Sequence, residues 1–224
     1  MKYKYLFASF AMLFVDTVVA ADASLDTDKK KMSYAIGAQI GNDFKRSGLD
    51  IDIEAMSKAI SDVINGNKPA LSQNEFQQAL NLLREQQMKK QMAAGDKNKK
   101  AGEAFLAENK KKPGIITLPS GVQYKVIKKG SGKSPTPANS VVAHYEGRLI
   151  NGTVFDSSIK RGKPATFPVT GVIKGWVEIL QKMKVGSKWE VYIPSDLAYG
   201  ARGTGPVIGP NATLIFDIEL LEIK

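Results

Sequence analysis

Cysteine is absent from this chain of 224 residues, and His144 is its only histidine. A chain without thiols forms no disulfide scaffold, no CxxC redox site and no thiolate zinc site. A single imidazole also argues against multi-histidine metal sites and against Ser–His–Asp chemistry. The segment GKSPTP (132–137) lacks the spacing of a phosphate-binding P-loop. We therefore expect neither a cofactor nor a bound metal.

Long apolar runs are scarce, and the one near the N-terminus extends from Tyr5 to Val15 behind two lysines. Small residues follow it up to Ala20, which is the layout of a secretory signal peptide. A transmembrane anchor is the alternative, but the run is too short for one and Asp16 interrupts it. We predict export, with cleavage after Ala20 or Ala21 and an address in the periplasm, at the outer membrane or on the cell surface.

Acidic residues are outnumbered, 22 against 32 lysines and arginines, which gives a net charge of +10. Such a surplus favours acidic partners such as nucleic acids or anionic membranes. The surplus is dense in residues 89–112, where eight lysines stand against three acidic residues. The regular interleaving of aromatic residues that base stacking needs is missing there. We interpret the stretch as a solvated helix and predict no nucleic-acid partner.

Proline and glycine are scarce before Pro113, since nine of the ten prolines and fourteen of the twenty glycines lie at or after it. This shift predicts a helical N-terminal half and a C-terminal half rich in turns and strands. A parallel βαβ order is missing, so the predicted class is α+β. The predicted divisions are a signal peptide (1–20), a helical domain (21–71), a long connecting helix (72–112) and a sheet domain (113–224).

Three helices are predicted before Pro113, over residues 28–46, 52–64 and 72–112. The third opens on the capping-box pair Ser72 and Glu75, and if unbroken it contains 41 residues and spans roughly 60 Å. Gly95 and Gly102 are weak points in it. The first two helices carry apolar stripes at helical spacing, at Met32, Ile36, Ile40 and Phe44 and at Met56, Ala59, Ile60 and Val63.

These helices are too short to bury their apolar faces against one another. We therefore expect a second copy of the chain to complete the core, in a homodimer held by residues 21–83. Gly37 and Gly41, four residues apart, would let another helix approach closely. A return onto the chain's own C-terminal half is the alternative, but residues 84–112 hold few apolar side chains. We expect that stretch to be a solvent-exposed strut.

The C-terminal half is predicted to be an antiparallel sheet with one short helix. Asn151–Gly152 is a hairpin signal, and the helix covers residues 175–183. The predicted strands are 122–128, 140–150, 188–193 and 212–223. In the last strand, alternation with polar residues predicts one buried face, made of Leu214, Phe216, Ile218 and Leu220.

Aromatic residues gather near the turns of this half, with one carboxylate, Asp156, beside them. For each aromatic residue alone, core packing is the simpler interpretation, and Asp156 alone would suit an Asx-turn. As a set they form a candidate site without a nucleophile–base pair. The aromatic residues are Tyr145, Phe155, Trp176, Tyr199 and Phe216.

The C-terminal half resembles the FKBP family of peptidylprolyl cis–trans isomerases over about residues 115–224. The resemblance rests on VVAHYEGRLINGTVFDSS (141–158), GVIKGWVEIL (171–180), IPSDLAYG (193–200) and GPNATLIFDIELLEI (209–223). The helical half, with YAIGAQIGNDF (34–44), is similar to the macrophage infectivity potentiator (Mip)/FkpA branch, which consists of exported, V-shaped homodimers. The resemblance implies an isomerase for proline-containing exported clients, a chaperone-like cleft between the dimer arms, and a role in virulence.

The resemblance also implies a proline-binding pocket that macrolides such as rapamycin would enter. Trp176 would be its floor, Asp156 and the Tyr199 hydroxyl would face the ligand, and the Ile173 N–H would hold a substrate carbonyl. The implied walls are Tyr145, Phe155, Val172, Ile173, Tyr199 and Phe216, with Phe167 nearby and Ala165, Thr204 and Ile208 at the rim. Small eukaryotic members carry an aromatic residue in place of Ala165, and some carry histidine in place of Thr204. These differences bear on the preference for the residue before proline.

Such a pocket suits the chemistry of proline isomerisation. Rotation about the X–Pro bond faces a barrier of about 18–20 kcal/mol because the planar amide is resonance-stabilised. A dry aromatic pocket disfavours the more dipolar planar form, and hydrogen bonds to the rotating group favour the twisted form. Two other hypotheses stay open: a proline-binding adhesin or chaperone with incidental turnover, and a basic polymer-binding protein whose binding would fall steeply with salt.

Overall fold

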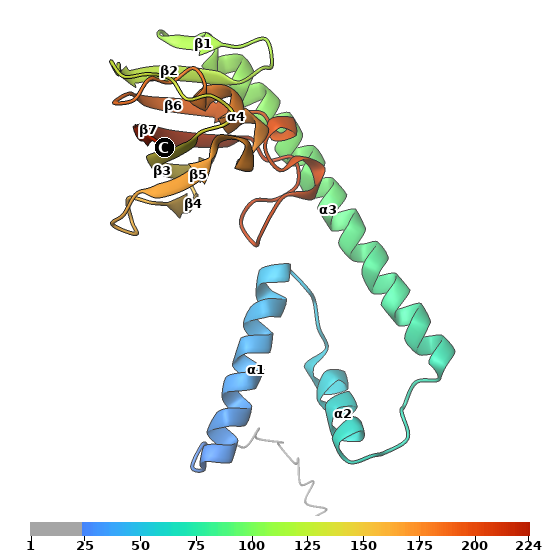
Figure 1. Cartoon of the computed structure of the whole chain (residues 1–224). Helices are drawn as coiled ribbons and strands as arrows, with labels where there is room; N and C mark the ends of the chain where they lie inside the picture. Colours follow the sequence, from blue (N-terminus) through green and yellow to red (C-terminus); the bar gives the residue numbers. More distant parts are fainter. Residues whose placement is uncertain (1–23) are drawn as a thin grey trace, which may run out of the picture. The chain divides into compact units, whose positions relative to one another are not determined.

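The computed structural model describes residues 24–224, which divide into two compact units, 24–52 and 53–224. The predicted signal peptide and its cleavage sites lie outside the described residues. No helix within residues 24–224 has both the length and the apolarity to cross a membrane. In Figure 1 the helices before the sheet run from blue to green, and the strands run from green to red.

The helix of the first unit is α1 (Asp28–Ser47). Thr27 caps its N-terminus, because the hydroxyl accepts a hydrogen bond from the Lys30 N–H at 3.3 Å. Gly48 ends it with a left-handed backbone, φ 62°. The predicted helix over 28–46 is confirmed to within one residue.

The second unit opens with helices α2 (Ile53–Ile64) and α3 (Gln73–Asn109). The predicted capping box is present: the Ser72 hydroxyl accepts from the Glu75 N–H at 3.3 Å, and the Ser72 N–H donates to the Glu75 carboxylate at 2.8 Å. Helix α3 contains 37 residues rather than the predicted 41, because Ser72 is its N-cap and it ends before the three lysines that precede Pro113.

Apolar side chains stand exposed on α1, on α2 and on the first part of α3. No residue of α1 or α2 is buried, and Val63 of α2 is 80% exposed. Exposed apolar faces of this extent are typical of surfaces that bind another molecule. The exposed residues are Met32 and Ile36, then Ile53, Ile60, Val63 and Ile64, then Phe76, Leu82, Met88 and Met92.

The second part of α3 is not the solvent-exposed strut that the sequence predicted. Its buried residues are Gly95, Gly102 and Asn109, seven residues apart and thus on one face. A Cβ at Gly95 would lie 3.2 Å from the Pro210 Cβ, and one at Gly102 would overlap the Thr213 hydroxyl. The prediction is therefore wrong from Gly95 to Asn109, where the glycines allow close approach to the C-terminal half.

Polar side chains complete this contact. Asn109 Nδ2 donates to Gln123 Oε1 at 3.0 Å, and Gln123 Nε2 donates to the Leu106 carbonyl at 2.9 Å. Asn109 and Gln123 are both buried, so loss of these bonds would leave desolvated amides. Phe105 packs on Tyr192 with ring centroids 5.9 Å apart. The sequence prediction failed here because it looked for apolar side chains, whereas glycines, amides and one aromatic ring hold this part of the helix.

Seven strands within residues 24–224 form one antiparallel sheet (Figure 1). Their order is β1-β2-β6-β7-β3-β4, and β5 pairs with β3. The sheet and the helices confirm the α+β class, although the short strands β1, β4 and β5 were not predicted. The strands are β1 (Ile115–Thr117), β2 (Gln123–Lys128), β3 (Ser140–Leu149), β4 (Val154–Ser157), β5 (Ala165–Pro168), β6 (Lys188–Ile193) and β7 (Leu214–Ile223).

The core lies between the sheet and helix α4 (Lys174–Leu180), whose predicted range was 175–183. Trp176, Ile179 and Leu180 of α4 are buried against the sheet. The predicted inward face of β7 is confirmed, because all four alternating apolar residues are buried: Leu214, Phe216, Ile218 and Leu220. Burial of these side chains is the main favourable contribution to folding of this half.

Candidate active site

A cavity of about 650 Å³ opens beside α4. Sites for small ligands have about this volume, with mostly apolar walls and a few polar groups that fix orientation. Six aromatic residues line the cavity: Tyr145 from β3, Phe155 from β4, Phe167 from β5, Trp176 from α4, Tyr199 from the segment after β6, and Phe216 from β7. The remaining lining residues are Asp156, Gly171, Val172, Ile173, Thr204, Gly205, Pro206, Val207 and Ile208.

Trp176 forms the centre of the aromatic lining. Its ring meets three neighbours edge to face, with centroid distances of 5.4 Å to Tyr145, 5.6 Å to Phe167 and 5.3 Å to Phe216. Edge-to-face contacts of this length are the favoured arrangement of aromatic pairs. The indole is buried, and its N–H has no hydrogen-bond partner among residues 24–224. The cavity therefore has a rigid apolar floor.

The hairpin of β3 and β4 aligns the residues of one wall. Gly147 pairs with Asp156 across the two strands, and a Cβ at Gly147 would overlap the rings of Phe155 and Phe216. Only glycine leaves room for these rings, which meet edge to face at 5.6 Å. The predicted turn between the strands is confirmed, with Gly152 in a left-handed conformation, φ 85°.

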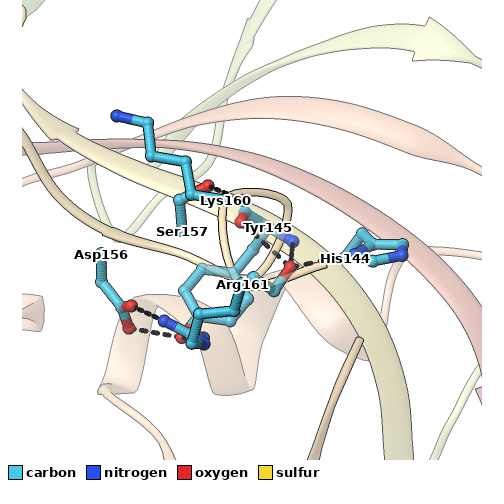
Figure 2. Close-up of polar contacts among 7 residues, drawn as sticks. His144, Tyr145, Asp156, Ser157, Lys160 and Arg161 are labelled. Carbon is cyan, nitrogen blue, oxygen red and sulfur yellow. Dashed lines mark hydrogen bonds and ion pairs between the residues drawn. The ribbon is translucent and has the colours of Figure 1, made fainter. Parts of the chain in front are cut away.

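The polar corner of the cavity is built from Tyr145, Asp156 and Arg161 (Figure 2). The Tyr145 hydroxyl and the Arg161 guanidinium both donate to the Asp156 carboxylate. Arg161 also donates to the Tyr145 oxygen at 2.9 Å and lies over the Tyr145 ring, 5.6 Å from its centroid. In Figure 2 one carboxylate oxygen of Asp156 is joined to the Arg161 guanidinium and the other to the Tyr145 hydroxyl. Asp156 and Arg161 thus form an ion pair to which the Tyr145 hydroxyl is also bonded.

The protonation states of this corner follow from its contacts. Burial raises the pKa of Asp156, but the hydrogen bonds from Tyr145 and Arg161 outweigh it, so the pKa lies below the ordinary value of 3.8. Burial and the hydrogen bond to Asp156 raise the pKa of Tyr145 above the ordinary 10.0. At neutral pH the aspartate is ionised and the tyrosine is neutral, so this corner is a fixed dipolar group and not a proton relay.

His144 takes part in holding the strand behind this corner. The Ser158 hydroxyl accepts from the Tyr145 N–H at 2.8 Å and lies 3.1 Å from His144 Nδ1. Figure 2 shows the imidazole directed away from Asp156. The only histidine of the chain therefore has a structural contact. Among residues 24–224, no group of three or more histidine and acidic side chains is placed to hold a metal ion.

The opposite wall is a loop, which we call the rim loop and define as residues 203–211. Gly203 opens it with a left-handed backbone, φ 64°. The Thr204 N–H donates to the Ile208 carbonyl at 2.8 Å, which closes the loop on itself. Ile208 is buried at the cavity, whereas residues 204–207 are exposed. Tyr199 stands beside the loop with 39% of its surface exposed.

The structure brings together eleven of the twelve site residues that the sequence singled out. Ala165 is the exception, because it packs in the partly buried layer around the core and does not line the cavity. Arg161, Gly171 and residues 205–207 were not among the predicted site residues. Arg161 could have been found from its place five residues after Asp156 in a tight turn, where its N–H donates to the Ser157 carbonyl at 3.3 Å. The glycine-rich loop sequence gave no comparable signal.

Fold and site together define a class. A sheet packs on one short helix, and an aromatic cavity with one ionised carboxylate opens beside that helix. Residues 131–221 match the family described as FKBP-type peptidyl-prolyl cis-trans isomerase, and residues 29–126 match the domain amino terminal to such isomerases. The chain belongs to the FKBP-type peptidyl-prolyl cis-trans isomerases, and it is an enzyme of that class.

Its place within the family follows from relatives of the same length. The chain is 48% identical to "Outer membrane protein MIP" of Legionella longbeachae, over 100% of this chain and 99% of that protein. It is 44% identical to the isomerase Mip of Coxiella burnetii, over 95% and 94%. The crystal structure of FkpA from Escherichia coli matches with a TM-score of 0.65 at 32% identity, over 90% and 99%. The predicted likeness to the Mip/FkpA branch is confirmed.

Proposed function

We propose that the aromatic cavity is the isomerisation site and that the proline ring of a client lies on Trp176. The support is geometric: the indole is buried beneath a cavity of about 650 Å³, and three rings stand edge to face around it. A flat apolar floor with upright rings accepts a five-membered ring and excludes water from it. Exclusion of water disfavours the dipolar planar amide relative to the twisted state.

The polar groups of the cavity orient the amide in this proposal. Ile173 precedes the first turn of α4, where backbone N–H groups lack partners within the helix and can hold a substrate carbonyl. The Tyr199 hydroxyl is a second donor at the rim. The carboxylate of Asp156 is fixed by Tyr145 and Arg161 before substrate arrives, so its field costs no reorganisation during rotation. No bond to the protein forms, and no proton moves.

The test is turnover of a short proline peptide by the full mature chain. Asp156→Ala removes the acceptor of charge-assisted hydrogen bonds and should lower kcat/KM about ten- to hundredfold. Tyr199→Phe removes one neutral donor and should lower it about two- to tenfold. Tyr124→Phe is the matched control, because Tyr124 stacks on Trp189 at 4.3 Å outside the cavity. Unchanged turnover in both site variants would refute the proposed site.

Rapamycin gives an independent test of the same cavity. We expect it to compete with proline peptides, since a macrolide with a proline-like ring would occupy the space above Trp176. Its binding is measured by the quenching of tryptophan fluorescence. Trp189 is the second tryptophan of the chain and lies outside the cavity, so Trp189→Phe leaves Trp176 as the reporter. Rapamycin binding that leaves Trp176 fluorescence and peptide turnover unchanged would place the macrolide elsewhere.

We also propose a homodimer held by residues 21–83. The support is the exposed apolar residues of α1, α2 and the first part of α3, which a partner copy of the same chain would cover. Ile36→Glu and Ile60→Glu should dissociate the dimer in light scattering, because each would bury a charge in the interface. Ser33→Glu on the exposed surface of α1 is the control for added charge. A mature chain that is monomeric at all concentrations would refute the proposal.

Dimerisation has a consequence for protein clients. Two cavities joined in one particle raise the local concentration of catalyst around a client that exposes several prolines. The Ile36→Glu monomer should therefore slow the refolding of a proline-limited protein more than it slows peptide turnover. Asp156→Ala should do the reverse. Equal losses for the monomer in both assays would mean that the dimer has no role in client handling and no chaperone-like cleft.

The proposed address of the enzyme is outside the cytoplasm, in the periplasm or at the outer membrane. The support is the signal-peptide pattern of residues 1–20 and the name of the Legionella longbeachae relative. Mass spectrometry of the mature protein should find Ala21 or Asp22 as the first residue. Clients would then be exported proteins. We also propose a role in virulence. Retention of Met1 in the mature pool would refute export by cleavage.

A further inference from the structure

The last residues of the rim loop and those that follow it contact the connecting helix α3. Ile208 lines the cavity, and Gly209 to Thr213 then run along α3 before β7 begins at Leu214. In Figure 1 this segment, orange to red, lies against α3. One end of the cavity wall is therefore attached to a helix that lies before the sheet domain in the chain.

Two hydrogen bonds join the helix to this segment. Asn98 Nδ2 donates to the Pro210 carbonyl at 2.8 Å. In the opposite direction, Asn211 Nδ2 donates to the Gly95 carbonyl at 3.4 Å. Both bonds are partly buried, so water competes for them less than at an open surface. The reciprocal pairing fixes the direction of the loop as well as its distance from the helix.

Close packing reinforces these bonds. A Cβ at Gly209 would lie 3.2 Å from Asn98 Nδ2, and a Cβ at Gly95 would lie 3.2 Å from both Pro210 and Asn211. Each glycine therefore leaves room for side chains of the other segment. Asn211 itself has a left-handed backbone, φ 54°, a conformation that asparagine adopts more readily than other non-glycine residues.

The rest of the rim loop has few attachments of its own. Residues 204–207 are exposed, and the loop is closed by the bond from the Thr204 N–H to the Ile208 carbonyl. The Asn211 N–H donates to the Gly200 carbonyl at 2.8 Å. A loop of glycines and exposed residues held in this way has many accessible conformations. Its attachment to α3 narrows them toward the one that lines the cavity.

We propose that Asn98 of α3 is a positioning residue for the isomerase cavity, acting through the Pro210 carbonyl on residues 204–208 of the rim loop. The connecting helix then has a second role besides joining the two parts of the chain, because it completes one wall of the cavity. The inference rests on the proposed location of the active site. Asn98 touches no substrate, so it acts on how well the substrate is held and not on the barrier to rotation.

The experiment uses the full mature chain with Asn98→Ala and Asn98→Asp. Asn98→Asp keeps the size of the side chain but places a charged acceptor against the Pro210 carbonyl, so it should weaken this contact at least as much as Asn98→Ala. Loss of one neutral hydrogen bond should raise KM for a proline peptide about two- to tenfold, with kcat changed less than twofold. Asn81→Ala is the matched control, because Asn81 is an exposed asparagine on the first part of the same helix. It gains the same helix propensity and should leave KM unchanged.

A second readout does not depend on catalysis. The backbone amides of Gly205 and Val207 report on the rim loop by NMR, and their order parameters should fall in both Asn98 variants and stay unchanged in Asn81→Ala. Thermal unfolding of each variant checks that the domain stays folded. Unchanged KM together with unchanged Gly205 and Val207 signals would overturn the proposal. Loosened loop signals with unchanged KM would overturn the catalytic part of the role.

These outcomes are separable from failure of the proposed site. If Asp156→Ala and Tyr199→Phe leave turnover intact, the site is wrong, whereas the order parameters of the rim loop still test its attachment to α3. If those variants lose activity and Asn98→Asp changes neither KM nor the loop, the site stands and the positioning role is wrong.

Discussion

The two parts of α3 differ in burial, and the difference is the opposite of what their composition suggests. The first part, Gln73 to Ala94, carries large apolar side chains, and Phe76, Leu82 and Met92 are all more than half exposed. The second part is rich in lysine and glycine, and yet Gly95 and Asn109 are its buried ends. An apolar surface on one part and a buried contact on the other thus occur along one continuous helix.

The two parts of α3 therefore have different binding partners: another molecule for the apolar part, by our proposal, and the chain's own sheet domain for the glycine-containing part. Exposed apolar residues on the first part are typical of a surface that binds another molecule, and we propose a second copy of the chain there. Glycines on the second part allow backbone approach to the same chain, where a Cβ would collide. Hydrogen bonds from Asn98 and Asn109 supply direction. The first part of the helix therefore belongs to a proposed dimer interface, and the second part packs against the sheet domain.

The largest effect is expected from removing the second part of α3 by truncation. A fragment of residues 113–224 loses the second part of α3 and exposes Gln123 and Tyr192, whereas a fragment of residues 84–224 keeps these contacts. We expect the shorter fragment to lose about 2 kcal/mol or more of unfolding free energy relative to the longer one. Urea denaturation of both fragments measures it.

A cut at residue 113 also removes the attachment of the rim loop. The shorter fragment should therefore turn over proline peptides with a higher KM than residues 84–224, even under conditions where both are folded. Equal stability and equal KM for the two fragments would show that α3 packs on the sheet domain without supporting it. The second part of α3 would then act only as a connector, although it contacts the sheet domain.

A smaller effect is expected from alanine at Gly102. The new Cβ would overlap the Thr213 hydroxyl next to the start of β7, so the helix must move away from the sheet. Strain of this kind costs about 1–3 kcal/mol, against a gain of about 1 kcal/mol in helix propensity. We expect a net loss of about 1 kcal/mol in thermal or urea unfolding. A gain in stability would mean that the helix shifts freely on the sheet.

Gly37→Ala on α1 is the corresponding substitution in the proposed dimer interface. Nothing lies within 4 Å of a Cβ at Gly37, so the single chain gains about 1 kcal/mol of helix propensity. If another copy approaches α1 at this glycine, the same substitution weakens the dimer. Light scattering across a dilution series distinguishes these effects. A more stable dimer would show that Gly37 faces away from the interface.

The fold could largely be predicted from local patterns. Alternation in β7, the capping box at Ser72 and the turn at Gly152 all depend on residues close together in sequence. The contact of Gly102 with Thr213 depends on residues 111 positions apart in number, and glycine has no side chain whose pattern could announce it. Short strands such as β4 and β5 are too brief to show a period.

The residues of the candidate site likewise divide into those that local sequence predicts and those that only the fold brings together. Aromatic residues such as Trp176 carry their signal in their own chemistry and in the motifs around them. Arg161 was missed because one arginine in a turn looks like any solvated charge until its neighbours Asp156 and Tyr145 are placed in space. Ala165 was assigned to the rim from resemblance and stays a prediction; it packs against the core on the same face of β5 as Phe167, which lines the cavity.

The smallest effect is expected from pH, because the polar corner holds its charges over a wide range. The folded pKa of Asp156 lies below 3.8, so its contribution to stability is present above about pH 4 and is lost as pH falls through the folded value. The pKa of Tyr145 lies above 10.0, so its contribution is present below about pH 10 and is lost as pH rises through the folded value.

Turnover of a proline peptide should therefore be constant within about twofold between pH 5 and pH 9. Asp156→Asn keeps the shape of the side chain without its charge, so it should lower turnover and also remove the decline below pH 4 that the wild type shows. The first part of α3 loses its capping box in the same acid range, because hydrogen bonds from Ser72 lower the pKa of Glu75 below 4.5. Circular dichroism at each pH separates this loss of helix from the loss of activity. An activity step near pH 6 or 7 that Asp156→Asn leaves in place would show that a group outside this corner controls turnover.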